Sequence, residues 1–121
     1  MIKSTELNAA SKTKVPEIDG LIEYLALHNQ ELYEKARQEN ISSNILDEFL
    51  ENTKKLSPAE RSVFDLYREG RTAKEISEIL SLSINTIKTH TKRIYTKLNI
   101  NSREELLLYD SLLKEIGKKI E

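Results

Sequence analysis

Three closely spaced signals for the start of a helix dominate the second half of the sequence. Ser57–Glu60, Thr72–Glu75 and Ser102–Glu105 each read Ser or Thr, two further residues, then Glu. This spacing is typical of a capping box, in which hydroxyl and carboxylate each accept a hydrogen bond from the other residue's backbone amide. Gly70 lies between the first two signals and favours the left-handed conformation that ends helices. The region is therefore expected to fold into several short helices.

The helix expected after Ser83 has two unlike faces. At 3.6 residues per turn, one side carries a largely apolar stripe, formed by Ile84, Ile87, Thr91, Ile94 and Leu98. The opposite side carries Asn85, Lys88, Thr89, Lys92 and Thr96. We expect the helix to dock through its apolar side and to present the polar, basic side outward. The shorter helix before it is expected to bury Ile76, Ile79 and Leu80.

Charge is distributed unevenly along a chain whose net charge is −1. Residues 1–55 carry seven basic and ten acidic residues, whereas residues 56–121 carry twelve basic and ten acidic ones. Ser81–Arg103 contains five basic residues and no acidic residue. A local basic stretch favours contact with a polyanion. A solvated lysine face has the same charge, so the order of the residues must decide.

That order indicates a helix-turn-helix over Thr72–Leu98. Two short helices are joined by the three residues Ser81–Ser83, and the second helix has the basic outer face. The major groove of DNA is wide enough to admit such a helix. Lysine can donate to guanine acceptors, and threonine offers a hydroxyl and a methyl group. We therefore predict that Lys88, Thr89 and Lys92 lie against base edges.

The first half of the chain divides into two parts by pattern. Residues 1–15 are polar without periodicity and are expected to form a flexible tail. Residues 16–55 are expected to form a helical linker or dimerisation arm, and residues 56–121 the DNA-binding domain. Within the arm, apolar spacing predicts one amphipathic helix from Ile18 to about Gln38 and a second that begins near Ser42 or Ser43.

Several classes of function are not supported by the sequence. The chain has no cysteine and three glycines, and it contains no glycine-rich phosphate loop, nucleophile elbow or clustered metal ligands. We therefore expect no enzyme activity, no cofactor and no metal site. It also contains neither an apolar run long enough for a membrane span nor a secretory signal. We expect a cytoplasmic protein without a membrane partner.

Residues from Leu56 to about Tyr109 resemble the LuxR/GerE-type helix-turn-helix domain, which is also the output domain of NarL-like response regulators. The matching stretches are Leu56–Arg61, Gly70–Ile76, Asn85–His90 and Lys97–Arg103. Two residues depart from the family pattern. Ser81 stands where glycine is usual, and a left-handed serine costs about 1 kcal/mol. Thr91 stands where an aliphatic residue is usual, so this position is less buried or its hydroxyl bonds the preceding turn.

The resemblance implies an all-α fold: a four-helix domain preceded here by one or two amphipathic helices. It implies a sequence-specific transcriptional regulator whose recognition helix, about Ser83–Leu98, lies in the major groove of double-stranded DNA. Positions matching Lys88, Thr89 and Lys92 tend to face bases in such domains. Positions matching Asn85, Thr86, Arg93 and Lys97 lie nearer phosphates or the rim. The fourth helix often dimerises, so we expect a homodimer, with RNA polymerase as a further possible partner.

Two other classes of protein remain open. One is a fragment like region 4 of a sigma factor, which binds core polymerase and needs no dimer. The other is a protein–protein interaction module with a degenerate helix-turn-helix, against which the Lys88 and Lys92 face argues. Residues 1–55 are too few for a receiver or ligand-binding domain at the usual scale of about 100–150 residues, so we expect no phosphoacceptor and no signal pocket.

Overall fold

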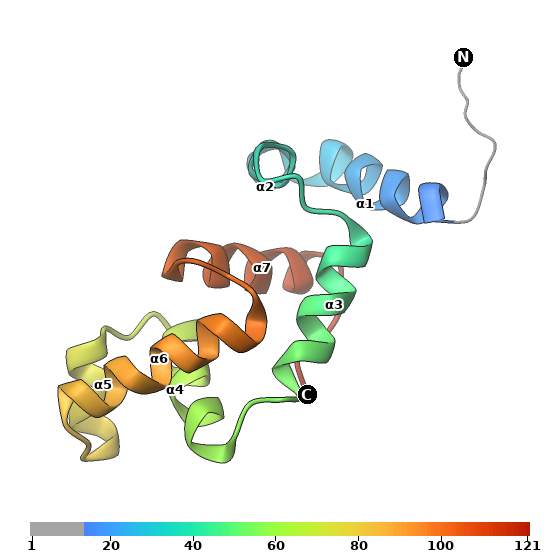
Figure 1. The fold of residues 1–121 in the computed structure, drawn as a ribbon. Coiled ribbons are helices and arrows are strands. Elements are labelled where there is room, and N and C mark those ends of the chain that lie inside the picture. Colours follow the sequence, from blue (N-terminus) through green and yellow to red (C-terminus); the bar gives the residue numbers. More distant parts are fainter. Residues whose placement is uncertain (1–13) are drawn as a thin grey trace. The chain divides into compact units, whose positions relative to one another are not determined.

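The computed structural model describes residues 14–121, and all regular structure in that range is α-helical (Figure 1). The helices are α1 (Lys14–His28), α2 (Gln30–Gln38), α3 (Ser43–Thr53), α4 (Pro58–Arg68), α5 (Ala73–Leu80), α6 (Ile84–Leu98) and α7 (Arg103–Glu115). The all-α prediction is confirmed. Three helices precede α4 rather than the one or two expected, and residues 1–13 of the predicted tail lie outside the described range.

The described part of the chain divides into two compact units, the first ending at residue 47 and the second spanning residues 48–121. In the first unit α1 and α2 pack against each other, with Leu25 and Ala36 fully buried. The prediction of one helix from Ile18 to about Gln38 is wrong, because the chain breaks at Asn29. The Asn29 side chain accepts a hydrogen bond from the Leu32 amide at 3.1 Å, which caps α2. Asparagine favours such a cap over a helix interior, and the apolar spacing did not reveal it.

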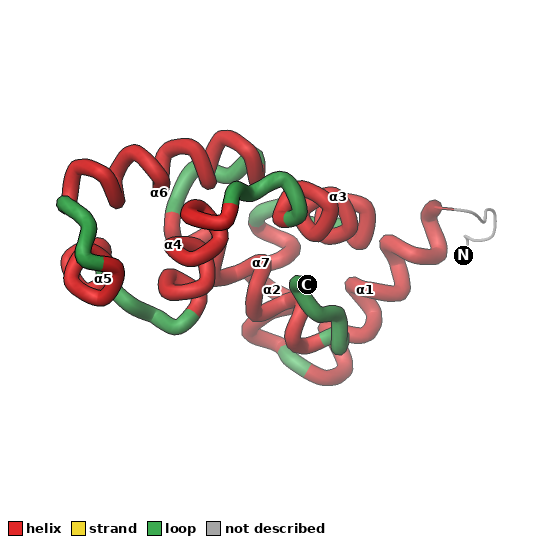
Figure 2. Tube along the Cα trace, turned by 90° about the horizontal axis from the view of Figure 1, so that it is seen from below, coloured by secondary structure: helices red, strands yellow, loops and turns green. Residues whose placement is uncertain are grey.

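The second unit is organised around α4, which packs against α5, α6 and α7 (Figures 1 and 2). Its core includes the fully buried side chains of Val63, Phe64, Ile76, Ile87, Ile94 and Leu106. Phe49, near the end of α3, joins this core: its ring centroid lies 6.4 Å from that of Phe64 and 4.8 Å from that of Tyr109. The unit therefore takes in residues 48–55, which the sequence analysis assigned to the arm.

Capping signals set the starts of the helices in this unit. Ser57 and Glu60 exchange both hydrogen bonds of a capping box at 3.1 and 2.9 Å, and Thr72 and Glu75 do the same. At α7 the Ser102 hydroxyl accepts from the Glu105 amide, but the Glu105 carboxylate accepts from the amide of Asn101 instead. Ser102 has a φ of −157°, against −68° for Ser57, which turns its own amide away. The third predicted box is therefore only half formed.

Five helices, α2 and α4 to α7, end in the same way. A residue of positive φ follows each, and the next amide reaches back to a carbonyl five residues earlier, at 2.9–3.1 Å. In the described part of the chain these residues are Asn40, Gly70, Ser81, Asn99 and Gly117. Glycine and asparagine tolerate this conformation, whereas serine is strained in it. Ser81, with φ of 55° and ψ of 44°, confirms the left-handed serine expected in the turn.

The short helix α5 buries less than predicted. Ile76 is fully buried and Leu80 is half-buried, but Ile79 is 50% exposed. At 100° per residue Ile76 and Leu80 lie within 40° of each other, while Ile79 lies on the other side of Ile76. A helix of only eight residues offers a narrow contact to its neighbours, so its edge position stays in solvent. The prediction that Ile79 is buried is therefore wrong.

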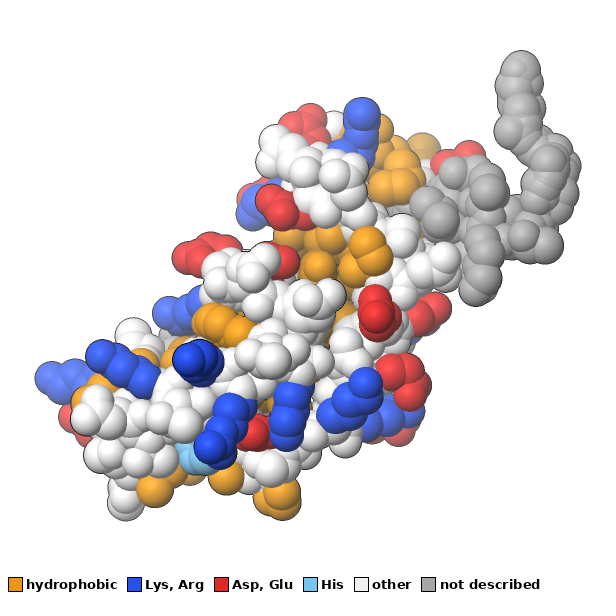
Figure 3. Space-filling model, in the orientation of Figure 1, with side chains coloured by type: hydrophobic (Ala, Val, Ile, Leu, Met, Phe, Trp, Pro, Cys, Tyr) orange, Lys and Arg blue, Asp and Glu red, His pale blue; other side chains and the backbone are white. Residues whose placement is uncertain are grey.

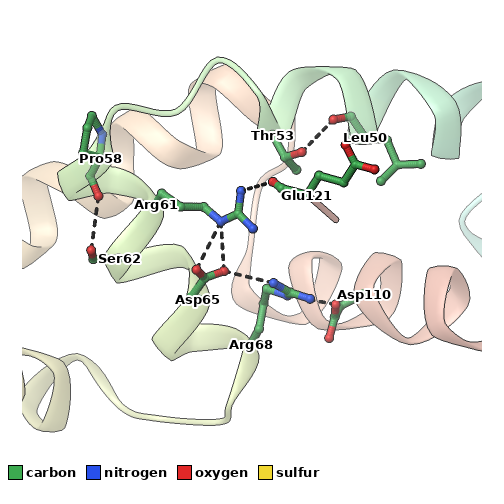
Figure 4. Close-up of polar contacts among 9 residues, drawn as sticks. All are labelled: Leu50, Thr53, Pro58, Arg61, Ser62, Asp65, Arg68, Asp110 and Glu121. Carbon is green, nitrogen blue, oxygen red and sulfur yellow. Dashed lines mark hydrogen bonds and ion pairs between the residues drawn. The ribbon is translucent and has the colours of Figure 1, made fainter. Parts of the chain in front are cut away.

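Charged side chains join α4 to α7 (Figure 4). Arg68 pairs with Asp65 at 2.9 Å and with the nearly buried Asp110 at 3.0 Å. Arg61 also pairs with Asp65, at 3.0 Å, and donates to the backbone carbonyl of Glu121. Arg61 and Arg68 thus each have an acidic partner within the fold.

Among the helices of the described range, none has the length and apolar character that a membrane span requires.

Candidate nucleic-acid interface

The two faces predicted for the third helix of the domain are present on α6. Ile87, Ile94 and Leu98 are buried, whereas Ile84, at the start of the helix, is 39% exposed. The opposite side is solvent-exposed throughout: Asn85, Lys88, Thr89, Lys92 and Thr96. Figure 3 shows lysine and arginine side chains gathered over α6 and continuing toward the connection between α3 and α4. The helix is thus docked on its apolar side and basic on its outer side.

The cations on the outer side of α6 are available to a ligand. Lys88, Lys92 and Arg93 are exposed, and none of the three forms a hydrogen bond or ion pair with another residue in the described range. The arginines of α4 differ, because their guanidinium groups are paired with Asp65. An unpaired cation can neutralise a ligand's charge without first breaking a bond within the protein.

The polar side chains near the start of α6 are oriented by the helix itself. The Thr89 hydroxyl donates to the carbonyl of Asn85 at 3.1 Å, so its oxygen can still accept a hydrogen bond from a ligand. Thr86 lies half-buried beside Ser83, with 2.9 Å between their hydroxyl oxygens. Ser83 in turn accepts from the Thr86 amide and caps the helix. Thr86 therefore lies at the rim of the exposed face, and Thr89 lies on it.

Lys97 has a different environment from the other predicted site residues. Its ammonium donates to the Glu60 carboxylate at 2.7 Å and to the backbone carbonyl of Lys55 at 3.2 Å. Glu60 is buried, and the hydrogen bond from Lys97, followed by that from the Ser57 amide, lowers its pKa below the usual 4.5. The structure therefore brings Lys97 to the start of α4, where its charge is balanced within the protein.

A second polar link joins α6 to α4. The Thr91 hydroxyl donates to the carbonyl of Ile87 at 2.8 Å and lies 2.9 Å from the hydroxyl of Tyr67. Since the single Thr91 proton goes to Ile87, Tyr67 is the donor to Thr91. Both alternatives expected for Thr91 hold, because the residue is half-buried and its hydroxyl bonds the preceding turn. The sequence predicts Tyr67 as a packing residue of the core but does not indicate its hydrogen bond to Thr91, 24 positions away in the chain.

This geometry defines a helix-turn-helix, with α5 as its first helix and α6 as its second. Residues 54–109 match the family described as bacterial regulatory proteins, luxR family (GerE). This part of the chain is therefore a luxR-family helix-turn-helix domain, as the resemblance in the sequence implied.

Individual relatives match part of the chain. The transcriptional regulatory protein LiaR of Bacillus subtilis is 39% identical over 54 residues, which are 45% of this chain and 26% of LiaR. The probable transcriptional regulator ycf29 of Pyropia yezoensis is 35% identical over 78 residues, which are 64% of this chain and 34% of that protein. The chain thus spans about a third or less of these curated relatives. No solved structure matches it.

Proposed function

We propose that the chain is a sequence-specific, DNA-binding transcriptional regulator whose helix α6 lies in the major groove. The observation that carries this proposal is the exposed face of α6, where Lys88 and Lys92 have no partner among the described residues. Two proteins named as transcriptional regulators are similar to this chain over 54 and 78 residues, which supports the proposal. Binding to an operator would then alter the access of RNA polymerase to a neighbouring promoter.

The side chains of α6 have distinct roles in this proposal. Lys88, Thr89 and Lys92 contact base edges, since they lie together on the exposed face in the first three turns of the helix. Asn85, Thr86 and Arg93 contact phosphates or the rim of the groove. Lys97 was expected to contact phosphate as well, but the engagement of its ammonium by Glu60 supports a role in holding α6 on α4.

Salt dependence follows from the number of unpaired cations. Lys88, Lys92 and Arg93 are three such groups on α6, whereas the sequence suggested five basic groups in this region. Each cation that neutralises phosphate charge, whether it ends at a base edge in the groove or on a phosphate, contributes about −0.9 to the slope of log K against log salt. We therefore expect the three cations of α6 alone to contribute about −3 for each bound copy. Fluorescence anisotropy of a labelled duplex, measured over a series of salt concentrations, gives this slope.

The experiment that tests the function is selection of bound sequences from a random duplex library. The wild type should enrich a defined motif, and Lys88→Ala/Lys92→Ala should not, because the groove-facing cations are gone. Lys35→Ala/Arg37→Ala is the control, since it removes two exposed positive charges from α2. Absence of any enriched motif for a folded wild-type chain would favour a protein-interaction module instead.

We further propose that the regulator binds as a homodimer, as the resemblance to LuxR-type domains implies. On α7, Leu107 and Leu108 remain partly exposed and could contribute to a seam, whereas Leu112 is fully buried in the chain. A dimer would enrich an inverted repeat in the selection, with half-sites about one helical turn apart. Light scattering at the concentrations used for binding would give the mass directly.

A further inference from the structure

Lys97 holds a second lysine beside the recognition helix. Its ammonium, balanced by Glu60 at 2.7 Å, also donates to the backbone carbonyl of Lys55 at 3.2 Å. The amide of Lys55 donates to the carbonyl of Asn52 at 3.0 Å. Both backbone polar groups of Lys55 are therefore fixed in place, in the connection between α3 and α4.

The side chain of Lys55, by contrast, is free. It is exposed, and no hydrogen bond or ion pair ties its ammonium to another residue between positions 20 and 121. The neighbouring Lys54 differs, since its ammonium lies 3.1 Å from the Glu51 carboxylate. The two adjacent lysines are thus both exposed, but only Lys54 is paired with an acidic residue.

Lys55 lies next to the edge of α6 that carries Arg93 and Lys97, because its backbone carbonyl accepts a hydrogen bond from Lys97. Arg93 and Lys97 are four residues apart and therefore lie on the same side of the helix. The acid at this edge, Glu60, is buried and already paired with Lys97. Figure 3 shows the basic side chains continuing past α6 toward the α3–α4 connection, where Lys55 lies. Because Lys97 is paired with Glu60, it is not available to contact a phosphate there, whereas the adjacent Lys55 is.

We infer that Lys55 is a DNA-backbone contact and that Lys97 is the residue that positions it. This inference rests on the proposed function, because it presumes that α6 lies against DNA. A phosphate contact adds affinity without reading sequence, so Lys55 would strengthen binding to all duplexes alike. The DNA-contacting surface would then begin before residue 56, in the segment that sequence analysis assigned to the arm.

The test compares Lys55→Ala with Lys54→Ala in the full chain, by anisotropy of a fixed duplex over a series of salt concentrations. For Lys55→Ala we expect the salt slope to become less steep by about 0.9 for each bound copy, with the same loss on specific and random duplexes. Lys54→Ala removes the same charge one residue away, from an existing ion pair, and should leave the slope nearly unchanged. Lys55→Arg keeps a cation there and should retain the wild-type slope.

The outcomes separate the inference from the proposed function. If wild type shows salt-dependent binding that Lys88→Ala/Lys92→Ala abolishes, but Lys55→Ala leaves the slope unchanged, Lys55 makes no phosphate contact. Equal changes in Lys54→Ala and Lys55→Ala would also overturn the inference, because they would indicate a general effect of net charge. A folded wild type without salt-dependent DNA binding would overturn the inference and the proposed function together.

Discussion

Whether a lysine on α6 is available to a ligand depends on its neighbours on other helices. Spacing within the sequence was enough to place Lys88 and Lys92 on one exposed face, because the helical period alone sets that arrangement. The sequence could not distinguish Lys97 from them, since its partner Glu60 lies 37 positions away. Glu60 was recognised as a capping residue, yet nothing local indicates that a capping carboxylate also binds a distant lysine.

The pairing of Glu60 with Lys97 makes stability dependent on pH. Because the pKa of Glu60 is lowered in the folded chain, its contribution is fully present above pH 4.5 and is lost as the pH falls below that value. Lys97→Met should lower the free energy of unfolding at neutral pH by about 1–3 kcal/mol, a range reduced for the partial exposure of Lys97. The difference from wild type should shrink as Glu60 becomes protonated. Urea unfolding at neutral and acidic pH measures it.

Lys92→Met serves as the control for this experiment. Lys92 is on the same helix but exposed and without a described partner, so its replacement should change stability little at either pH. A loss in Lys97→Met that stays constant down to low pH would contradict the assignment to the charged pair.

The Tyr67–Thr91 hydrogen bond allows a double-mutant cycle. Thr91→Val keeps the shape of the side chain but leaves the Tyr67 hydroxyl, on a residue 6% exposed, without its acceptor. An unsatisfied buried hydroxyl costs about 1–3 kcal/mol, so the single variant should be destabilised by that order. Tyr67→Phe/Thr91→Val removes both partners and should recover part of the loss. Thermal unfolding of the four proteins would show purely additive effects if the bond contributes nothing.

At the scale of the helices, local signals predicted most boundaries in the second unit. Capping boxes at Ser57 and Thr72 and the stop at Gly70 act within a few residues, so they can be recognised without knowledge of the packing. The failures have equally local causes that are harder to recognise. Asn29 can be a cap or an ordinary surface residue, and the spacing of Ser102 and Glu105 does not reveal the extended φ that diverts the carboxylate to Asn101.

Ser81 ends α5 in a conformation that is strained for serine, so its replacement can raise the stability of the domain. It occupies a left-handed conformation in which glycine carries no strain, so Ser81→Gly should raise the free energy of unfolding by about 0.5–1 kcal/mol. Ser83→Gly is the matched control in the same turn. Ser83 caps α6 from an extended conformation with φ of −68°, so its replacement by glycine should lower the free energy of unfolding by about 0.3 kcal/mol. Equal changes in the two variants, measured by urea unfolding, would exclude relief of strain at Ser81.

For the whole chain, the boundary of the DNA-binding unit is the feature that sequence patterns located least well. The family match begins at residue 54 and the sequence signals at residue 56, whereas the compact unit begins at Glu48. The difference lies in Phe49, whose ring packs against Phe64 and Tyr109. From the sequence alone, an apolar residue of α3 could pack into the core of either unit, so its position does not indicate which one.

Two fragments of the chain test this boundary. Residues 42–121 keep all of α3 with Ser42, whose hydroxyl accepts from the Ile45 amide, and should fold and bind DNA. Residues 56–121 lack Phe49 and should be less stable by at least about 3 kcal/mol, the cost of removing a buried phenylalanine side chain. Circular dichroism on heating compares them, and equal melting temperatures would show that Phe49 is dispensable.

The left-handed helix ends have a consequence for how this domain tolerates change. The start and stop of α6 are determined by Ser83 and Asn99, which make their bonds within the helix's own terminal turns. Core residues such as Ile94 determine how tightly the helix is held but not which residues it contains. Substitutions can therefore accumulate in the core while Lys88, Thr89 and Lys92 keep the same angular order. The spacing of these side chains on α6 is therefore separable from the stability of the domain that holds the helix.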